Sequence, residues 1–247
     1  MAPLLRVDRV YRFYGPEGAQ TPVLRDVSFE LAEGEFLCVM GPSGSGKSSL
    51  LHLISGLDDP SAGEIELAGQ KLSQLRPAER TRLRRRAIGY VFQFFNLLPN
   101  LTLEENVALP IAIRGARPEH HREPVRALLD RFGIADRAGH LPHQLSGGQM
   151  QRASIARALV GDQPLILADE PTGNLSQQAG LEIMQTLRRV CDEDGRSVLL
   201  VTHNPRDAAF ADRVLFLVDG ALDPAHALVG PGIAVEDVHA ALTALHI

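Results

Sequence analysis

Phosphate binding is the first chemistry that the residues suggest, through the run GPSGSGKS at residues 41–48. This run fits the pattern G-x-x-x-x-G-K-S/T, in which glycines let backbone N–H groups point at phosphate oxygens and a lysine adds a mobile positive charge. Lys47 and Lys71 are the only lysines in a chain that otherwise uses arginine, and a compact ammonium fits between phosphates better than a planar guanidinium. The sequence therefore predicts a nucleotide site formed by Gly41, Ser43, Gly44, Gly46, Lys47, Ser48 and Ser49.

A second candidate anion site lies in the pentapeptide LSGGQ at residues 145–149. The pattern predicts a helix that begins at Gln149, so the serine and glycines before it lie where unpaired N–H groups and the helix dipole favour an anion. The candidate residues are Ser146, Gly147, Gly148 and Gln149. One chain thus carries two regions suited to phosphate.

An apolar run at residues 165–168 ends in two carboxylates, Asp169 and Glu170. A buried strand that ends beside a phosphate loop can deliver one carboxylate to Mg²⁺ and the next to the water that attacks the terminal phosphate. We expect Asp169 and the Ser48 hydroxyl to bind Mg²⁺ and Glu170 to polarise water. The alternative is an acidic pair that only stabilises the N-terminus of a helix.

These three segments together resemble the ATP-binding cassette (ABC) family, in which LSGGQ is the signature motif and binds the γ-phosphate of ATP held by a partner's phosphate loop. The resemblance covers about residues 4–220 and implies ATP and Mg²⁺ as ligands. Residues 89–107 are similar to the lipoprotein-release, macrolide-efflux and cell-division branch of the family. Because that branch serves varied substrates, the resemblance indicates a type of machine and not a cargo.

The resemblance also implies roles for three residues outside these segments. Gln93 matches the family's Q-loop glutamine, which contacts Mg²⁺ or the water, and it is expected where a helical insert joins the core. His203 matches the switch histidine, which contacts the γ-phosphate. Tyr11 is matched with the aromatic residue that stacks on adenine, although Tyr14 is close enough to compete and a packing role is the alternative.

The sequence departs from the family pattern after the acidic pair. The family's D-loop usually ends in Leu-Asp, whereas Leu175 is followed here by Ser176. Asn204 also follows His203 where aspartate is more usual. The resemblance therefore implies ATP binding but leaves the link between two nucleotide sites, and with it the hydrolysis rate, open.

The hydrophobic pattern and the resemblance predict an α/β fold with a P-loop NTPase (RecA-like) core. Short apolar runs between helical segments are typical of buried parallel strands. Strict alternation of apolar and polar residues indicates antiparallel strands in a side sheet. Core strands are expected at 36–40, 88–92, 165–168, 197–202 and 214–218, and side strands at 27–31 and 64–67.

We expect residues 1–247 to form one ABC ATPase domain with three parts. They are an antiparallel β subdomain at about 1–35 and 60–75, the core at about 36–93 and 155–220, and an inserted α-helical subdomain at about 94–154. Val125, Leu128, Leu129 and Phe132 recur at helical spacing inside the insert. The tail at 221–247 matches no family pattern.

Composition restricts the partners. The chain has 25 basic and 30 acidic side chains and a formal net charge of −5, so it offers no bulk attraction to nucleic acid. The arginines at 80–86 indicate a solvated helix face, with a nucleic-acid patch as the alternative. Cys38 and Cys191 have no metal-binding or disulfide pattern and are expected to be packing thiols.

No apolar stretch approaches the roughly 18 residues that span a bilayer, and the N-terminus lacks a signal-peptide core. Together with these features, the resemblance implies an ATPase that is cytoplasmic and peripheral on the cytoplasmic face of the membrane. The resemblance implies a head-to-tail homodimer and separate transmembrane permease subunits that dock near residues 93–99. A soluble ABC ATPase with a non-membrane partner is the alternative, and a P-loop kinase or GTPase would lack LSGGQ.

Overall fold

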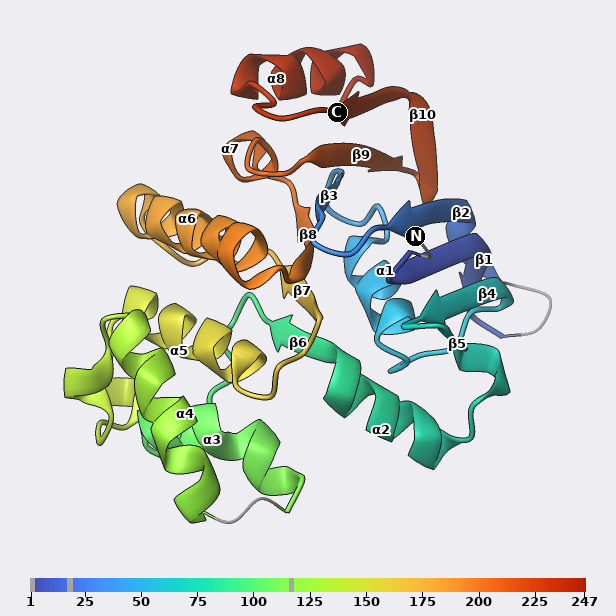
Figure 1. Cartoon of the computed structure of the whole chain (residues 1–247). Helices are drawn as coiled ribbons and strands as arrows, with labels where there is room; N and C mark the ends of the chain where they lie inside the picture. The colour runs from blue at the N-terminus through green and yellow to red at the C-terminus, as the bar shows by residue number, and fades with distance from the viewer. Residues whose placement is uncertain (1–2, 17–19, 116–117) are drawn as a thin grey trace.

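The computed structural model describes residues 3–16, 20–115 and 118–247. Residues 1–2, 17–19 and 116–117, which the domain prediction includes, lie outside the described residues. Two sheets form the fold together with helices that gather mostly on one side, as Figure 1 shows. The larger sheet carries the candidate phosphate loop, and the smaller sheet flanks it.

The larger sheet is six-stranded, in the order β10-β9-β3-β8-β7-β6. Neighbouring strands are parallel except at the β9–β10 edge, where β10 is antiparallel. Its strands are β3 (Phe36–Met40), β6 (Ile88–Val91), β7 (Leu165–Asp169), β8 (Ser197–Thr202), β9 (Arg213–Val218) and β10 (Ala221–Val229). The five predicted core strands are all present, and this confirms the expected α/β fold.

The smaller sheet is antiparallel and four-stranded, in the order β2-β1-β4-β5. Its strands are β1 (Leu5–Tyr14), β2 (Thr21–Leu31), β4 (Ala62–Leu67) and β5 (Gln70–Lys71). Both predicted alternating segments lie in it. Along β2, Val27, Phe29 and Leu31 are buried while Ser28 and Glu30 are exposed, which is the pattern of a sheet with one solvated face.

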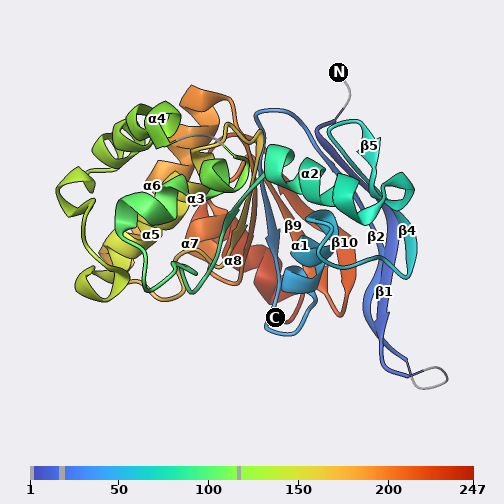
Figure 2. The ribbon, with the colours of Figure 1, turned by 90° about the horizontal axis from the view of Figure 1, so that it is seen from below.

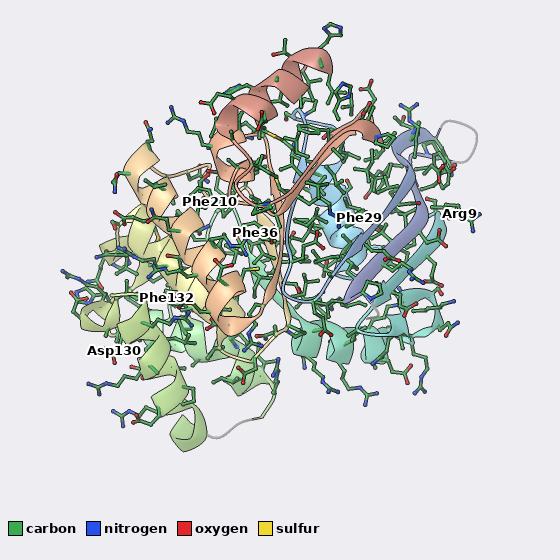
Figure 3. The ribbon with its side chains drawn as sticks, turned by 45° about the horizontal axis from the view of Figure 1, so that its top comes forward. Arg9, Phe29, Phe36, Asp130, Phe132 and Phe210 are labelled. Atoms are coloured by element: carbon green, nitrogen blue, oxygen red, sulfur yellow. The ribbon has the colours of Figure 1, made fainter. Side chains whose placement is uncertain are left out.

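Strand β3 divides the hydrophobic interior into two cores. Phe36 and Cys38 pack into the core that the helices cover, whereas Leu37 and Val39 pack into the core between the two sheets. Successive side chains of a strand point to opposite faces, so one short strand serves both cores. Figure 3 labels Phe36 in the first core and Phe29 in the second.

The helix α1 (Lys47–Ile54) packs in the core between the sheets, while most longer helices lie on the other side of the larger sheet, as Figure 2 shows. The other helices are α2 (Pro77–Ala87), α3 (Leu103–Ile113), α4 (Pro118–Arg131), α5 (Gly147–Leu159), α6 (Gln177–Asp194), α7 (Pro205–Ala208) and α8 (Val235–Ala244), with single 3₁₀ turns at Leu72–Gln74, Ala135–Arg137 and Pro142–Gln144. Val125 and Leu129 are buried on α4, and Phe132 follows it, as the helical spacing predicts.

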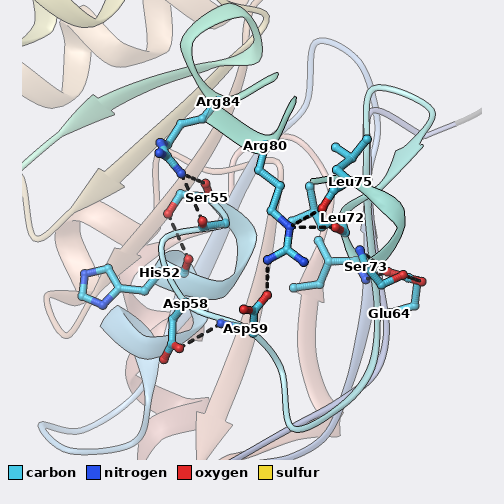
Figure 4. Close-up of polar contacts among 12 residues, drawn as sticks. His52, Ser55, Asp58, Asp59, Glu64, Leu72, Ser73, Leu75, Arg80 and Arg84 are labelled. Carbon is cyan, nitrogen blue, oxygen red and sulfur yellow. Dashed lines mark hydrogen bonds and ion pairs between the residues drawn. The ribbon is translucent and has the colours of Figure 1, made fainter. Parts of the chain in front are cut away.

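The arginine run lies on α2, and one of its members, Arg84, contacts the C-terminal end of α1, as Figure 4 shows. Arg84 donates from Nη1 to the carbonyls of Ser55, at 3.2 Å, and Gly56, at 3.0 Å. Arg80 pairs with Asp59. Backbone carbonyls at a helix end lack intrahelical partners, so the two contacts of Arg84 satisfy acceptors that α1 leaves open. The exposed arginines of α2 fit the expected solvated face.

The tail forms two elements that the sequence did not predict. Strand β10 extends the larger sheet at its edge, and its register with β9 is interrupted between Asp223 and Leu228, where Pro224 lies. Proline is tolerated at sheet edges and irregularities because it lacks an N–H donor. Helix α8 buries Val238 and Ala241. Among the described residues, no helix combines the length and hydrophobicity that a bilayer crossing requires.

Both cysteines are free and buried, as expected for packing thiols. Burial raises the pKa of Cys38, and it raises the pKa of Cys191 to about 11. Thiols with raised pKa values carry little reactive thiolate at neutral pH. Neither cysteine is therefore a candidate nucleophile.

Candidate functional site

The phosphate loop joins β3 to α1, and glycine is required at several of its positions. Gly44 and Gly46 have φ angles of 84° and 106°, in the region that residues with side chains rarely adopt. A Cβ atom on Gly41 would lie 2.2 Å from the carbonyl oxygen of Leu217. The loop can follow this path only with these glycines, and its path places Lys47 at the first position of α1.

A cavity of about 660 Å³ opens in front of this loop. It brings together residues from the ends of four core strands and from the phosphate loop. Its lining residues are Val23, Met40, Gly41, Pro42, Ser43, Gly44, Gly46, Lys47, Ser48, Ser49, Gln93, Glu170, His203, Leu242 and Ile247. The structure therefore gathers all of the predicted phosphate-loop residues with Gln93, Glu170 and His203.

Lys47 is buried with its ammonium against backbone carbonyls. Its Nζ donates to the carbonyl oxygens of Gly41, at 2.7 Å, and Pro42, at 2.9 Å, and it lies 4.0 Å from Glu170 Oε1. Burial lowers the pKa of Lys47, and the carboxylates of Glu170 and Asp169 partly oppose that shift. Because the groups that accept hydrogen bonds from Lys47 are neutral carbonyls, an anionic phosphate that enters the cavity is a stronger hydrogen-bond partner for this cation.

Glu170 and His203 form a pair at the edge of the same cavity. Glu170 Oε1 lies 2.8 Å from His203 Nδ1, and Glu170 Oε2 accepts a hydrogen bond from Thr202 Oγ1 at 3.2 Å. The backbone of Glu170 has a φ of 45°, which is uncommon for a residue with a side chain. Its N–H donates to the carbonyl of Val201 at 3.0 Å, so β8 holds this conformation in place.

Ser48 and Asp169 provide oxygen atoms suited to a hard cation. Ser48 Oγ donates to Asp169 Oδ1 at 3.3 Å. Burial raises the pKa of Asp169, whereas the Ser48 hydrogen bond lowers it. The described part of the chain contains no group of three or more His, Cys, Asp or Glu side chains placed to hold a metal by themselves. Since Mg²⁺ commonly binds through one or two protein oxygens plus substrate phosphates and water, the donor set fits it.

Gln93 lies between the cavity and the helical part of the chain. Its backbone carbonyl accepts from Asn174 Nδ2 at 2.9 Å. Just beyond it, Phe95 and Asn96 have φ angles of 58° and 48°. Arg157 of α5 donates to the carbonyl oxygens of both residues, at 2.8 and 2.6 Å. Burial lowers the pKa of Arg157 to about 10, so its guanidinium remains protonated at neutral pH.

The signature segment lines a second cavity, of about 320 Å³. Ser146 Oγ accepts from the N–H of Gln149 at 3.3 Å, and Gln149 Oε1 accepts from the N–H of Ser146 at 2.9 Å. This reciprocal cap starts α5 at Gly147, so the predicted start at Gln149 was wrong by two residues. The cavity is lined by Ser146, Gly147, Gly148, Arg152, Asn174, Leu175, Ser176, Ala179, Glu182 and Ile183. No residue lines both cavities.

Ser176, where the family pattern usually has aspartate, caps the next helix. Its Oγ accepts from the N–H of Ala179 at 3.4 Å, at the start of α6. Serine is a favoured N-cap residue because its hydroxyl satisfies an otherwise unpaired N–H group. The residue therefore has a structural role that a shorter or apolar side chain would lose.

Tyr11 is not among the residues that line the first cavity. It is partly buried on β1, with its ring stacked against Phe13 at 6.3 Å between centroids. The competing candidate, Tyr14, donates from its hydroxyl to Asp58 Oδ2 at 2.8 Å. The assignment of Tyr11 to adenine stays a prediction.

Besides Met40, which comes directly before the phosphate loop, the cavity includes three apolar residues that the sequence did not suggest, Val23, Leu242 and Ile247. They come from β2 and from the last residues of the chain, and Figure 2 shows the C-terminus beside the loop that leads to α1. None of them belongs to a motif. Only the folded chain brings them to the phosphate loop.

Comparisons with known proteins point in one direction. The family model described as "ABC transporter" matches residues 24–173. The lipoprotein-releasing system ATP-binding protein LolD of Shewanella oneidensis is 42% identical over 219 residues, which cover 89% of this chain and 95% of that protein. The macrolide export ATP-binding/permease protein MacB 1/2 of Paracoccus denitrificans is 45% identical over 221 residues, which cover 90% of this chain but 33% of that protein.

Solved structures agree with the sequence relatives. A dimeric, post-hydrolysis state of the ATP-binding cassette MJ0796 bound to ADP and Pi superposes with a TM-score of 0.84. The two sequences are 41% identical, and the superposed region covers 93% of this chain and 100% of the MJ0796 chain. The chain thus spans nearly the whole length of LolD and of that cassette, and about a third of MacB.

Proposed function

Because this chain belongs to the ABC transporter family, we propose that it is the subunit that binds and hydrolyses ATP in a transporter of that family. The observation that carries the proposal is the meeting of Lys47, Glu170 and His203 in one cavity. That arrangement combines a cation for phosphate with a carboxylate that can accept a proton from water. The predicted division into a β subdomain, a core and a helical subdomain is part of the proposal.

The chain's own residues have distinct roles in this proposal. The phosphates of ATP take the place of the carbonyls that hold Lys47, and the N–H groups of the glycine loop bind the same oxygens. Glu170 accepts a proton from the attacking water, and His203 orients Glu170 through their 2.8 Å contact. Ser48, Asp169 and Gln93 are proposed to hold Mg²⁺, which would neutralise charge on the phosphates.

We propose that a second copy of the chain completes the site. The signature residues Ser146, Gly147, Gly148 and Gln149 offer helix N–H groups to an anion, yet they line a cavity separate from that of Lys47. In a head-to-tail homodimer, each signature segment would contact the ATP of the other copy, and two equivalent sites would form. The solved relative MJ0796 is dimeric with ADP and Pi, which supports this proposal.

Transmembrane permease subunits are the proposed partners, and the location is proposed to be the cytoplasmic face of a membrane. Phe94, directly after Gln93, and Leu98, four residues further along the chain, are large apolar side chains that are exposed. Exposed apolar residues beside a catalytic residue are suited to a docking partner. The printed names of LolD and MacB, a lipoprotein-releasing system and a macrolide exporter, support a transporter of this branch. Nucleic acid is not a proposed partner.

Complementation between two inactive variants tests the shared site. Lys47→Ala removes the phosphate cation, and Gly148→Asp places a carboxylate in the signature segment. A Cβ on Gly148 would lie 3.7 Å from Ala179 Cβ, an ordinary contact, so this variant is expected to fold. A mixed dimer of the two variants contains one site in which both halves are intact. We expect each variant alone to be inactive and the mixture to hydrolyse ATP.

The mixture is measured at equal total protein, with each variant diluted by itself as the matched control. A phosphate-release assay is expected to give up to a quarter of the unmodified rate, since random pairing makes half of the dimers mixed and each mixed dimer has one of two sites intact. If the mixture remains as inactive as its components while the unmodified chain is active, the shared-site proposal is wrong.

A further inference from the structure

Asp207 is a buried carboxylate that the proposed mechanism does not use. It lies on α7, four residues after His203, and is 5% exposed. Its Oδ2 accepts a hydrogen bond from Thr172 Oγ1, and its backbone N–H donates to the carbonyl of Asn204 at 3.1 Å. Asp207 therefore contacts the segment that follows Glu170 and the segment that follows His203.

Thr172 is held between two helices. It lies two residues after Glu170, at the start of the loop that leads to Ser176 and α6. On one side, Asp207 of α7 accepts a hydrogen bond from its hydroxyl. On the other side, Gly180 of α6 approaches so closely that an added Cβ would lie 3.3 Å from Thr172 Cβ. The position of this loop is thus fixed by one hydrogen bond and one tight contact.

Two side-chain contacts join the chain segments that follow β7 and β8. Glu170 contacts His203 at 2.8 Å, and Thr172 contacts Asp207 a few residues further along each segment. The first contact includes the proposed catalytic groups, whereas the second lies outside the nucleotide cavity. Thr172 and Asp207 instead line a different cavity, of about 650 Å³. The second contact can therefore affect the first without touching the nucleotide.

A buried carboxylate is expensive unless hydrogen bonds compensate for its lost hydration. Burial raises the pKa of Asp207, the hydrogen bond from Thr172 lowers it, and the nearby Glu170 carboxylate raises it further. A leucine would fill the start of α7 without this penalty. A carboxylate at this position is understandable if its contact with Thr172 serves the site.

We propose that Asp207 is a positioning residue, which through its hydrogen bond to Thr172 holds the loop after Glu170 against α7 and keeps Glu170 and His203 in contact. This inference rests on the proposed function. It predicts that removing this hydrogen bond lowers kcat. It also predicts little change in KM for ATP, because neither Thr172 nor Asp207 lines the nucleotide cavity.

Thr172→Val tests the inference, because it removes the hydroxyl and keeps the shape of the side chain. We expect kcat for ATP hydrolysis to fall about 10-fold, with KM within about twofold, since a buried carboxylate would lose a hydrogen bond. Thr172→Ser restores the hydroxyl and is expected to restore kcat. Asp207→Asn is expected to lower kcat less than Thr172→Val does. The variant that carries both substitutions is expected to have the same kcat as Thr172→Val alone.

Thr186→Val is the matched control. Thr186 is also a buried threonine, but its hydroxyl donates to the carbonyl of Glu182 within α6, at 2.7 Å, and we expect unchanged kcat. Unchanged kcat in Thr172→Val, a rise in KM alone, or failure of Thr172→Ser to restore turnover would overturn the inference. Absence of ATP hydrolysis by the unmodified chain would instead overturn the proposed function.

Discussion

The two cavities suited to phosphate differ in what they contain. The cavity at the phosphate loop holds a buried lysine, the Glu170–His203 pair and the oxygens of Ser48. The signature cavity holds the capped start of α5, and its main charges, Arg152 and Glu182, lie 3.5 Å apart and face each other. The first region has groups for binding and for proton transfer, whereas the second offers mainly N–H groups.

This difference shows why one copy of the chain is insufficient in the proposed mechanism. The first cavity can hold a nucleotide but is open in front of the phosphate loop. The second can contact a phosphate, yet no lysine and no group comparable to the Glu170–His203 pair lines it. Each region has what the other lacks. The predictions below change one region at a time.

Glu170→Gln is expected to have the largest effect. We expect kcat to fall about 1000-fold with ATP affinity within a few fold, because a neutral amide cannot accept the proton of water. Size-exclusion chromatography with ATP is expected to show a dimer, since bound ATP persists. Glu182→Gln, which removes a carboxylate from the signature cavity, is the comparison and should lower kcat less than about fivefold. Equal losses in both variants would contradict the division of roles.

Lys47→Ala is expected to weaken ATP binding about 100-fold, because the triphosphate loses a charge-assisted partner in a buried setting. Titration calorimetry measures this change. Lys71→Ala is the matched control, since Lys71 is exposed on β5 and should leave affinity unchanged. Unaltered ATP affinity in Lys47→Ala would show that the first cavity is not the nucleotide site.

Ser146→Ala is expected to lower kcat about 10-fold and stability by about 1 kcal/mol, because it removes the cap of α5 and a hydroxyl proposed to contact phosphate. Ser176→Ala removes the cap of α6 and should reduce stability by a similar amount. Thermal unfolding and turnover are measured for both. A larger loss of turnover in Ser176→Ala would make the loop before α6 the more important of the two.

Asp169→Asn is expected to raise stability at neutral pH by less than about 1 kcal/mol, because the carboxylate is only partly desolvated. Burial raises the pKa of Asp169 in the folded state above its value in the unfolded state. Above the folded-state pKa, the charged carboxylate therefore lowers the free energy of unfolding, and this penalty disappears as the pH falls below the unfolded-state pKa. The gain over the unmodified chain should therefore shrink in acid. A gain that grows as pH falls would contradict this assignment.

The parallel strands were predictable because buried strands of this kind are continuous apolar runs. The predicted strands at 36–40 and 197–202 match the structure, and each of the other three differs from the observed strand by one residue at one end. Strand β10 was not predictable, since Pro224 and several partly exposed residues interrupt its pattern. Edge strands need not be apolar on both faces, so the sequence carries a weaker signal for them.

The site was predictable for the phosphate loop, for Gln93, for Glu170 and for His203, whereas Tyr11, which was also matched to the family, does not line the first cavity. Lys47, Glu170 and His203 lie in one cavity, as their motifs indicate. Val23 and Leu242 reach the same cavity from distant segments with no pattern of their own. Asp207 belongs to none of the motifs, and only the tertiary structure shows that it is buried and accepts a hydrogen bond from Thr172.

The two hydrogen bonds of Arg157 connect α5 to the chain segment that follows Gln93. Its guanidinium is bonded to two carbonyls in the stretch after Gln93, while its backbone belongs to α5, which Ser146 caps. If that stretch moved relative to α5, the guanidinium of Arg157 would lose both of its hydrogen bonds. Losing them is costly because burial has already removed much of its hydration. We therefore expect α5 and the stretch after Gln93 to move together when a partner displaces the exposed side chain of Phe94.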